Sequence, residues 1–290
     1  MVHGSFAVER EFDVSPSRLF AAWCDVSMKA RWFIGPPGAW TLIERALDVR
    51  VGGHETLRGR RASGVETLFS ARYHAVIPNQ RLVFAYDMHL DGKHSSTSLV
   101  TVELTARGAT RTLLTFTEQA AFHGGDDGTE SRRHVIDADL ARLTDELVDP
   151  RDIVSSRLFR APREDLFEAF RDGGRLAAWW GPKGFSCAFD VFEPRAGGRW
   201  RFTMQGPDGV TYPMVKDFTE VTAPERVAYR HSQEGHAFTM HMTFVDAGDA
   251  TLLIWRMRFD SVEEAKRVRS FIESANEENF DRLEAHLGRS

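Results

Sequence analysis

The chain has 290 residues, of which 42% are hydrophobic and 27% are charged, the composition of an ordinary globular protein. Its formal net charge of −5 argues against nucleic acid as the main partner, because phosphate binding needs a basic surface. The sequence also lacks a run of about 18 apolar residues that could cross a membrane.

Only two cysteines occur, Cys24 and Cys187, one in each half of the chain and at unrelated positions. This usage is typical of a reducing compartment, where structural disulfides are rare. The N-terminus lacks the basic start, apolar stretch and cleavage site of a signal peptide. We therefore expect a soluble, cytoplasmic protein with neither a membrane nor a nucleic acid as partner.

The second half of the sequence repeats the first. Four motifs return in the same order, with drifts of only a residue or two: 12–20 at 159–167, 30–38 at 177–184, 48–53 at 193–198, and 81–84 at 226–229. A solenoid repeat would have a period of about 20–50 residues, so a repeat this long is a whole domain. We predict two copies of one fold, residues 1–148 and 149–290, each within the usual size of a domain.

Each copy is predicted to contain a strand, a pair of short helices, several strands and a long closing helix. In the first copy, Asp91-Gly92-Lys93 has the residues of a hairpin turn. The glycine-rich stretch 124–128 then precedes a closing helix predicted over Glu130–Leu147.

The second copy gives stronger local signals. Strands are predicted at Asp152–Phe159, around Arg199–Met204, at Phe238–Phe244 and at Thr251–Phe259, mainly from residues that alternate between polar and apolar. Pro162 can open one short helix, which stops near Gly173, and Leu176–Trp180 forms a second. Ser261 and Glu264 have the spacing of a capping box at the start of a helix that continues to Leu287.

These motifs resemble a known family. In the second copy they are Pro162 followed by Leu166-Phe167, Trp179-Trp180-Gly181-Pro182, Arg195 followed by Gly197-Gly198 and Trp200, and Pro224-Glu225-Arg226. The set resembles the activator-of-heat-shock-protein-90-ATPase-like branch of the START/SRPBCC superfamily. The first copy is similar, and its segments Tyr86–Gly92 and Phe116–Phe122 resemble a bacterial subgroup of that branch.

The resemblance implies an α+β protein made of two tandem helix-grip (START/birch-pollen-allergen-like) domains. In each, a curved antiparallel sheet would surround a long C-terminal helix and enclose a cavity for apolar ligands. The first copy departs from the pattern with Phe33 in place of the second Trp, an inserted Ile34, and His54-Glu55 in place of Arg199-Trp200. His54 and Glu55 are expected at the strand surface.

The implied cavities give a set of candidate ligand-binding residues, most of them aromatic side chains or methionines. In the second copy these are Trp200, Phe202, Met204, Phe238, Met240, Met242, Trp255, Met257 and Phe271. In the first copy they are Phe69, Tyr86, Phe116 and Glu118. The same residues could instead form a packed core, since burial of a Trp alone stabilises a fold by several kcal/mol. The second copy has the fuller motif set, and its cavity is the first candidate.

The sequence contains few signals of metal binding, phosphate binding or catalysis. His231, His236 and His241 recur every five residues, but without the further ligands of a tetrahedral metal site they indicate polar surface or pocket lining. The glycine pairs at 52–53 and 197–198 lack the lysine of a phosphate loop and fit a tight turn before a strand. Trp32, Trp179 and Trp180 are expected to seal the helix pair against the sheet. No catalytic motif, metal site or cofactor site is predicted.

Three functions remain open. The first is a non-enzymatic module that binds a small hydrophobic, lipid-like or aromatic ligand. The second, implied by the branch name, is a co-chaperone in a stress response, with a chaperone partner or self-association through an exposed patch. The third is an enzyme such as a cyclase, dehydratase or hydrolase, which would place Glu118, as an acid with a raised pKa, His134 or His231 inside the cavity.

Overall fold

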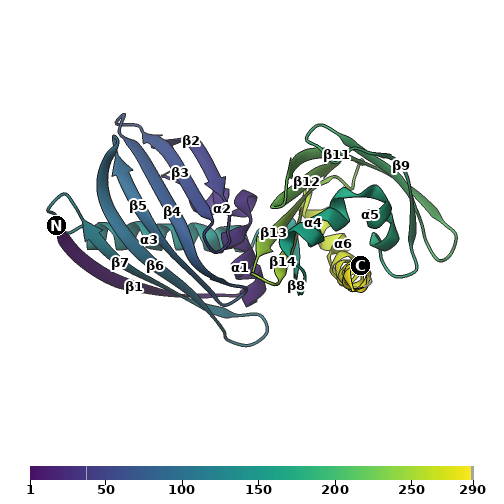
Figure 1. The fold of residues 1–290 in the computed structure, drawn as a ribbon, viewed down its shortest axis with the longest axis horizontal. Coiled ribbons are helices and arrows are strands. Elements are labelled where there is room, and N and C mark those ends of the chain that lie inside the picture. The colour runs from purple at the N-terminus through teal and green to yellow at the C-terminus, as the bar shows by residue number, and fades with distance from the viewer. Residues whose placement is uncertain (37, 289–290) are drawn as a thin grey trace. The chain divides into compact units, whose positions relative to one another are not determined.

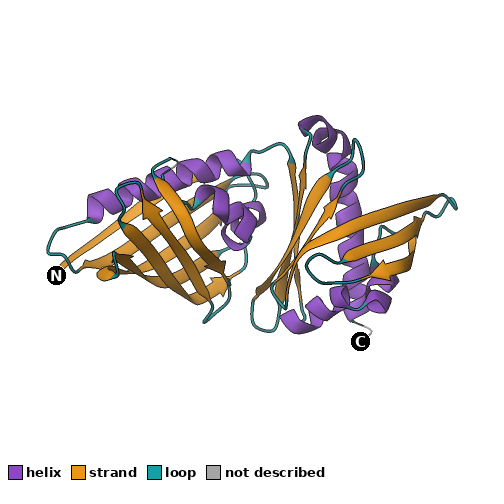
Figure 2. Cartoon of the chain, turned by 90° about the horizontal axis from the view of Figure 1, so that it is seen from above, coloured by secondary structure: helices purple, strands orange, loops and turns teal. Residues whose placement is uncertain are grey.

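The computed structural model describes residues 1–36 and 38–288. Contacts within the chain divide it into two compact units, Met1–Val148 (domain 1) and Asp149–Ser290 (domain 2). In each unit an antiparallel sheet curves around a long C-terminal helix (Figures 1 and 2). The chain is therefore an α+β protein of two tandem helix-grip domains, and the predicted fold class is confirmed.

Domain 1 begins with a strand and two short helices, β1 (Val2–Phe12), α1 (Pro16–Cys24) and α2 (Val26–Trp32). Six further strands follow: β2 (Trp40–Leu47), β3 (His54–Arg61), β4 (Glu66–Ile77), β5 (Arg81–Leu90), β6 (Lys93–Ala106) and β7 (Thr112–Phe122). They form one sheet in the order β1-β7-β6-β5-β4-β3-β2, and α3 (Thr129–Leu147) closes the domain.

Domain 2 repeats this order of elements. It contains β8 (Asp152–Phe159), α4 (Arg163–Arg171), α5 (Gly173–Trp179), β9 (Ser186–Phe192), β10 (Arg199–Gln205), β11 (Thr211–Thr222), β12 (Arg226–His231), β13 (Phe238–Asp246), β14 (Thr251–Phe259) and α6 (Val262–Leu287). The sheet order β8-β14-β13-β12-β11-β10-β9 matches that of domain 1. None of the helices in the described parts of the chain is long and apolar enough to span a membrane.

The repeat extends to individual hydrogen bonds. The indole N–H of Trp32 donates to the carbonyl of Ala22 over 2.9 Å, and Trp179 donates in the same way to Ala169 over 3.2 Å. Both indoles are 1% exposed. These contacts tie the second short helix of each domain to the first.

The same turn precedes β3 in domain 1 and β10 in domain 2. Gly52 and Gly197 have φ angles of 80° and 76°, a region that glycine adopts without strain. The amide of Gly52 donates to the carbonyl of Tyr73, and the amide of Gly197 donates to that of Phe218. The glycine pairs thus form tight turns before strands, as predicted.

The second glycine of each pair gives a stability prediction. A Cβ on Gly53 would lie 2.3 Å from the carbonyl oxygen of Asp48, and one on Gly198 would lie 2.1 Å from that of Glu193. Gly53→Ala and Gly198→Ala should each lower the free energy of unfolding of their own domain by about 2 kcal/mol or more, because backbone must move. Gly124→Ala is the control, since nothing lies within 4 Å of its Cβ position. Urea unfolding combined with hydrogen exchange would measure each domain, and losses no larger than the control's would contradict the prediction.

Candidate ligand-binding site

Domain 1 contains a cavity of about 830 Å³ between its sheet and α3. Its walls come from the segment after α2, the inner faces of β3, β4, β5 and β7, and one side of α3. The apolar residues that line it include Trp32, Phe33, Leu57, Phe69, Tyr86, Phe116, Phe122 and Val135. Three of the four residues predicted from the first copy, Phe69, Tyr86 and Phe116, are therefore brought together here.

The aromatic rings of this wall are in mutual contact. The ring of Phe69 lies 5.2 Å from that of Phe33 and 4.7 Å from that of Tyr86, measured between centroids. Phe69, Tyr86 and Phe116 are each less than a tenth exposed. The wall is thus a contiguous, largely buried aromatic surface.

Glu118 forms a polar cluster at the cavity with three neighbouring side chains. Its carboxylate is fully buried, and Oε1 accepts hydrogen bonds from the Tyr86 hydroxyl (2.7 Å), the Ser98 hydroxyl (2.8 Å) and the Arg132 guanidinium (3.1 Å). Arg132 also donates to the hydroxyl of Ser96. Tyr86 and Arg132 line the cavity themselves, so this cluster contributes polar groups to its wall.

Burial shifts the titration of both charged members of this cluster. It raises the pKa of Glu118 to about 7, against an opposing effect of the hydrogen bond from Ser98. It lowers the pKa of Arg132 to about 10. A carboxyl group with such a pKa can exchange a proton near neutral pH, which sequence analysis anticipated for Glu118 among the enzyme alternatives.

A second buried polar cluster lies beside the cavity and was not predicted. The ammonium of Lys29, a lining residue, donates to Oε2 of Glu55 over 2.6 Å and to the Tyr73 hydroxyl over 3.2 Å. The Tyr73 hydroxyl donates to the same Glu55 oxygen over 2.7 Å. Lys29 also lies 5.2 Å from the ring centre of Phe33. Burial lowers the pKa of Lys29, and the Glu55 carboxylate opposes that shift.

The expectation that Glu55 lies at the strand surface is therefore wrong. Its side chain is 1% exposed, whereas His54 next to it is exposed. The reason is the alternation of β3, which turns Glu55 and Leu57 to the inner face.

The candidate residues of domain 2 form a packed core. Trp200 stacks on Phe202 with centroids 4.5 Å apart and contacts the Trp180 ring at 5.0 Å. The buried members of this core cluster include Phe238, Met240, Met242, Trp255 and Met257, and Met204 packs against it from a partly buried position.

Phe271 requires a correction. It lies on α6 but is 67% exposed, because the buried stripe of that helix is formed by Val268, Ile272 and the residues that follow them at helical spacing. We remove Phe271 from the set of candidate binding residues.

Domain 2 also buries a lysine that sequence analysis missed. Lys216 is 4% exposed and donates to the Tyr229 hydroxyl over 2.9 Å. Its ammonium lies 4.3 Å from the ring centre of Tyr229 and 5.1 Å from those of Trp180 and Trp200. Burial lowers its pKa to about 7, and no ion pair with a carboxylate is found for it within residues 149–288.

The three predicted histidines have separate surroundings. Nδ1 of His231 lies 3.0 Å from the carbonyl oxygen of Val215, and burial lowers its pKa. His236 pairs with Glu264 on α6, while His241 lies further along β13. In residues 1–36 and 38–288, no group of three or more His, Cys, Asp or Glu side chains is arranged to hold a metal ion. His134, the remaining candidate acid or base, is exposed and lines the domain 1 cavity.

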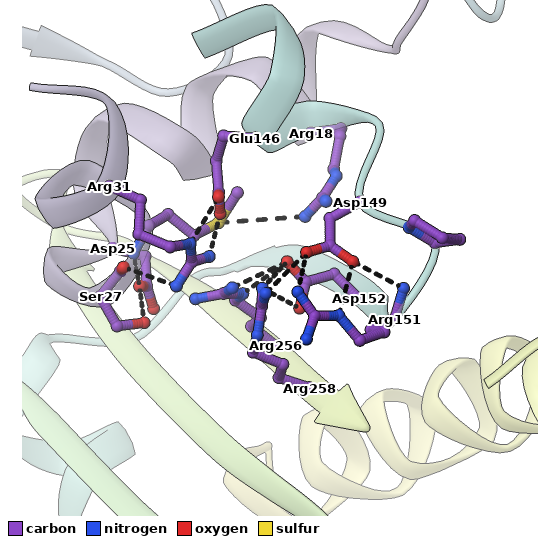
Figure 3. A network of polar contacts seen from close by, with 12 residues as sticks. Arg18, Asp25, Ser27, Arg31, Glu146, Asp149, Arg151, Asp152, Arg256 and Arg258 are labelled. Atoms are coloured by element: carbon purple, nitrogen blue, oxygen red, sulfur yellow. Dashed lines mark hydrogen bonds and ion pairs between the residues drawn. The ribbon is translucent and has the colours of Figure 1, made fainter. Parts of the chain in front are cut away.

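Polar contacts fix the short helices of domain 1 to α3. Figure 3 shows Arg31 of α2 paired with Glu146 of α3 through both carboxylate oxygens. Arg142 of α3 donates to the carbonyls of Trp32 and Ile34, each over 3.0 Å. These bonds hold the segment after α2, which forms part of the cavity wall, against the closing helix.

Within domain 2, polar contacts join the start of β8 to β14. Asp152 accepts hydrogen bonds from Arg256 over 2.7 Å and from Arg258 over 3.2 Å (Figure 3). Asp149 accepts from Arg151 over 2.8 Å and from Arg258 over 2.6 Å. The hydrogen bond from Arg151, helped by the charge of Arg258, holds the pKa of Asp149 well below its usual range.

Comparison with known families explains the repeat. The family model described as Activator of Hsp90 ATPase homolog 1-like protein matches residues 13–147 and again residues 160–288. The chain belongs to this family. The resemblance inferred from the sequence is thereby confirmed, with one Activator of Hsp90 ATPase homolog 1-like copy in each domain.

Solved structures match one copy at a time. The Mll3558 protein from Rhizobium loti is 37% identical, with a TM-score of 0.46, over 50% of this chain and 97% of that one. A putative uncharacterized protein from Rhizobium leguminosarum is 30% identical, with a TM-score of 0.48, over 50% of this chain and 95% of that one. The comparison with curated proteins gives no match.

Equivalent hydrogen bonds align the two Activator of Hsp90 ATPase homolog 1-like copies residue by residue. The hydroxyl of Thr112 on β7 donates to the carbonyl of Val14, and that of Thr251 on β14 donates to the carbonyl of Ala161. Counting along the two strands from these threonines places Glu118 on Met257.

The same approach aligns the remaining inner strands. The turns before β3 and β10 place Glu55 on Trp200. The registers of β5 with β6 and of β12 with β13 place Ser98 on Phe238. Domain 2 thus carries a larger or more apolar side chain at each of these three positions. In domain 2 these three side chains belong to the hydrophobic core cluster, whereas Glu55, Ser98 and Glu118 belong to buried polar clusters in domain 1.

Proposed function

We propose that domain 1 binds a small, largely apolar ligand in the cavity between its sheet and α3. The observation that carries the proposal is the volume of about 830 Å³ with walls formed mostly by aromatic and aliphatic side chains. Ligand sites in proteins fall in the range of about 300–1,000 Å³ and combine apolar walls with a few polar groups. Arg132, Tyr86 and Lys29 are such polar groups here.

The proposal moves the first candidate site from domain 2 to domain 1. Trp180, Trp200 and Phe202 of domain 2 pack against one another through ring contacts, as aromatic residues of a hydrophobic core do. Phe33, Phe69 and Tyr86 of domain 1 instead present ring surface to an open volume. A planar or chain-like apolar ligand would add dispersion contacts to those rings. We assign domain 2 a supporting role in which it binds no ligand of its own.

The family description names an activator of an ATPase, which is the alternative of a co-chaperone. Such a role needs an exposed partner surface, whereas the cavity is an internal feature of one domain. Ligand binding is therefore the function that the geometry supports best. Native and denaturing mass spectrometry of the purified chain, with solvent extraction, would test it. One equivalent of a bound apolar molecule would support it, and a bare mass with no stabilisation by a panel of lipids and aromatics would count against it.

Filling the mouth of the cavity should abolish binding. Ala138 is exposed on α3 and lines the cavity, so Ala138→Trp places an indole in the space of the ligand. We expect at least a tenfold loss of affinity for a fluorescent apolar probe such as 1-methylpyrene. Ala141→Trp is the matched control, since Ala141 is exposed on the same helix but does not line the cavity. Equal affinities of the two variants would contradict this location of the site.

A further inference from the structure

We propose that the Glu118 cluster recognises a single hydroxyl group on the otherwise apolar ligand, with Oε2 of Glu118 accepting its hydrogen bond. The inference rests on the proposed ligand-binding function of domain 1 and names the chemical class of the ligand. The ligand would be an alcohol or a phenol with a hydrophobic body.

The first argument is position. Glu118 alternates along β7 with residues of the outer face and shares the inner face with Phe116 and Phe122, which both line the cavity. Two of the side chains that contact its carboxylate, Tyr86 and Arg132, line the cavity as well. Glu118 itself does not line the cavity, so its carboxylate lies directly behind the part of the wall that Tyr86 and Arg132 form.

The second argument is hydrogen bonding. Three donors, from Tyr86, Ser98 and Arg132, converge on Oε1 of Glu118. Oε2 is equally buried, yet it has no hydrogen-bond partner among residues 1–36 and 38–288. A buried carboxylate oxygen without a donor is costly, so a donor supplied by a ligand would gain more there than in water. The cluster orients the carboxylate through one oxygen and leaves the other for recognition.

The third argument is charge. Arg132 already lies 3.1 Å from Oε1 of Glu118, so the pair is close to neutral when both groups are ionised. A ligand carboxylate would bring a second negative charge against Glu118, and a ligand ammonium would meet the guanidinium of Arg132. Either charged group would lose its hydration on binding, and neither would find an unpaired opposite charge in the site. A neutral donor avoids this loss, and a hydroxyl is the simplest neutral donor on an apolar molecule.

The fourth argument is the contrast between the two copies. The positions of Glu118 and Ser98 are occupied by Met257 and Phe238 in domain 2, which has the same fold. The helix-grip fold therefore does not require a carboxylate at this place. A buried charged cluster that the fold can do without, located at the wall of the cavity, is best explained by a role in recognition.

Three fluorescent probes of nearly equal size test the inference at pH 8, above the pKa of Glu118 of about 7. They are 1-hydroxypyrene, which carries the donor, 1-methoxypyrene, which has the oxygen without the donor, and 1-methylpyrene. We expect the full-length chain to bind 1-hydroxypyrene about tenfold more tightly than the other two, as a hydrogen bond to a charged group would give. Equal affinities for all three probes would overturn the inference while leaving the proposed function intact. Binding of none of them would remove the proposed function itself.

A variant adds a second test. Glu118→Met introduces the residue of domain 2 and should reduce the preference for 1-hydroxypyrene to less than about twofold, with the affinity for 1-methylpyrene kept. Glu103→Met, at an exposed position on β6, is the matched control and should keep the full preference. A preference retained in Glu118→Met would overturn the inference. If that variant does not fold, the three probes on the unmodified chain still decide between the outcomes.

Discussion

Replacing Lys216 by methionine is expected to stabilise domain 2 by about 2 kcal/mol at pH 7. The lysine is 4% exposed among aromatic rings, and its contacts within the domain are a hydrogen bond to Tyr229 and cation–π contacts without a carboxylate. Replacing a buried ion pair by well-packed apolar side chains of similar volume can stabilise a protein by roughly 1–4 kcal/mol, and a buried lysine without a carboxylate partner lacks even the attraction within such a pair. Loss of the hydrogen bond to Tyr229 offsets about 1 kcal/mol of that gain.

The pH dependence of stability should change with the same substitution. Burial lowers the pKa of Lys216 from 10.5 to about 7, so between these values the unfolded chain binds more protons at this site than the folded chain. The free energy of unfolding therefore rises as the pH increases from about 7 to 10.5. Below pH 7 the contribution of Lys216 to stability is at its most unfavourable. Lys216→Met should remove this slope.

Differential scanning calorimetry of the full chain from pH 6 to pH 10 would measure both effects. The unfolding transition of domain 2 should move to higher temperature in Lys216→Met, most at the acidic end. Lys266→Met, at an exposed position on α6, is the control and should leave both the midpoint and the slope unchanged. A domain 2 transition that moves down in Lys216→Met would show that the cation–π contacts outweigh the loss of hydration.

The repeat made the architecture predictable from the sequence. The motif offsets indicated two copies. Alternation predicted the strand Asp152–Phe159, and the preceding loop predicted the strand Thr251–Phe259, both with the bounds that the structure gives. Ser261 was predicted to cap the last helix and accepts a hydrogen bond from the amide of Glu264. These features are local, because a period of two residues or a capping side chain acts within a few residues.

Apart from Glu118, the buried charges were missed because polar residues are ordinarily assigned to the surface. The alternation of inward-facing and outward-facing residues along a strand could have indicated two of them. Lys216 and Phe218 share the inner face of β11, and Glu55 and Leu57 share that of β3. Arg132 of α3 could not be found in this way, since the buried stripe of that helix is weakly marked.

The location of the cavity could not be predicted either. It depends on the volume left between elements that are distant in the sequence, and the fuller aromatic motif set of the second copy favoured domain 2, whereas the proposed site lies in domain 1. Large rings such as Trp200 indicate where a core can be filled as readily as where a ligand can bind. The rings contact one another in both domains, and the open volume that Phe33, Phe69 and Tyr86 line in domain 1 is visible only in the folded structure.

Replacing Glu55 by leucine is expected to destabilise domain 1 by about 3–5 kcal/mol. This carboxylate lies 2.6 Å from the ammonium of Lys29, and both side chains are 1–2% exposed. Its loss would leave Lys29 as an unpaired buried charge, and the Tyr73 hydroxyl would lose its acceptor. Lys29→Met should also be destabilising, because it leaves the buried carboxylate of Glu55 without its cationic partner.

The double variant Lys29→Met/Glu55→Leu should recover most of the lost stability, since it removes both charges together. Urea unfolding of the four members of this double-mutant cycle would give the coupling between the two side chains. The Arg58–Glu66 pair is the control, since its side chains are 42% and 25% exposed and its coupling should be below about 1 kcal/mol. If Glu55→Leu lowered the free energy of unfolding by no more than the coupling energy of the Arg58–Glu66 pair, Lys29 and Glu55 would not form a stabilising buried ion pair. Lysine-to-methionine changes at 29 and 216 thus have opposite expected signs, because the lysine in domain 1 has a buried carboxylate partner whereas the lysine in domain 2 is bonded to a neutral hydroxyl.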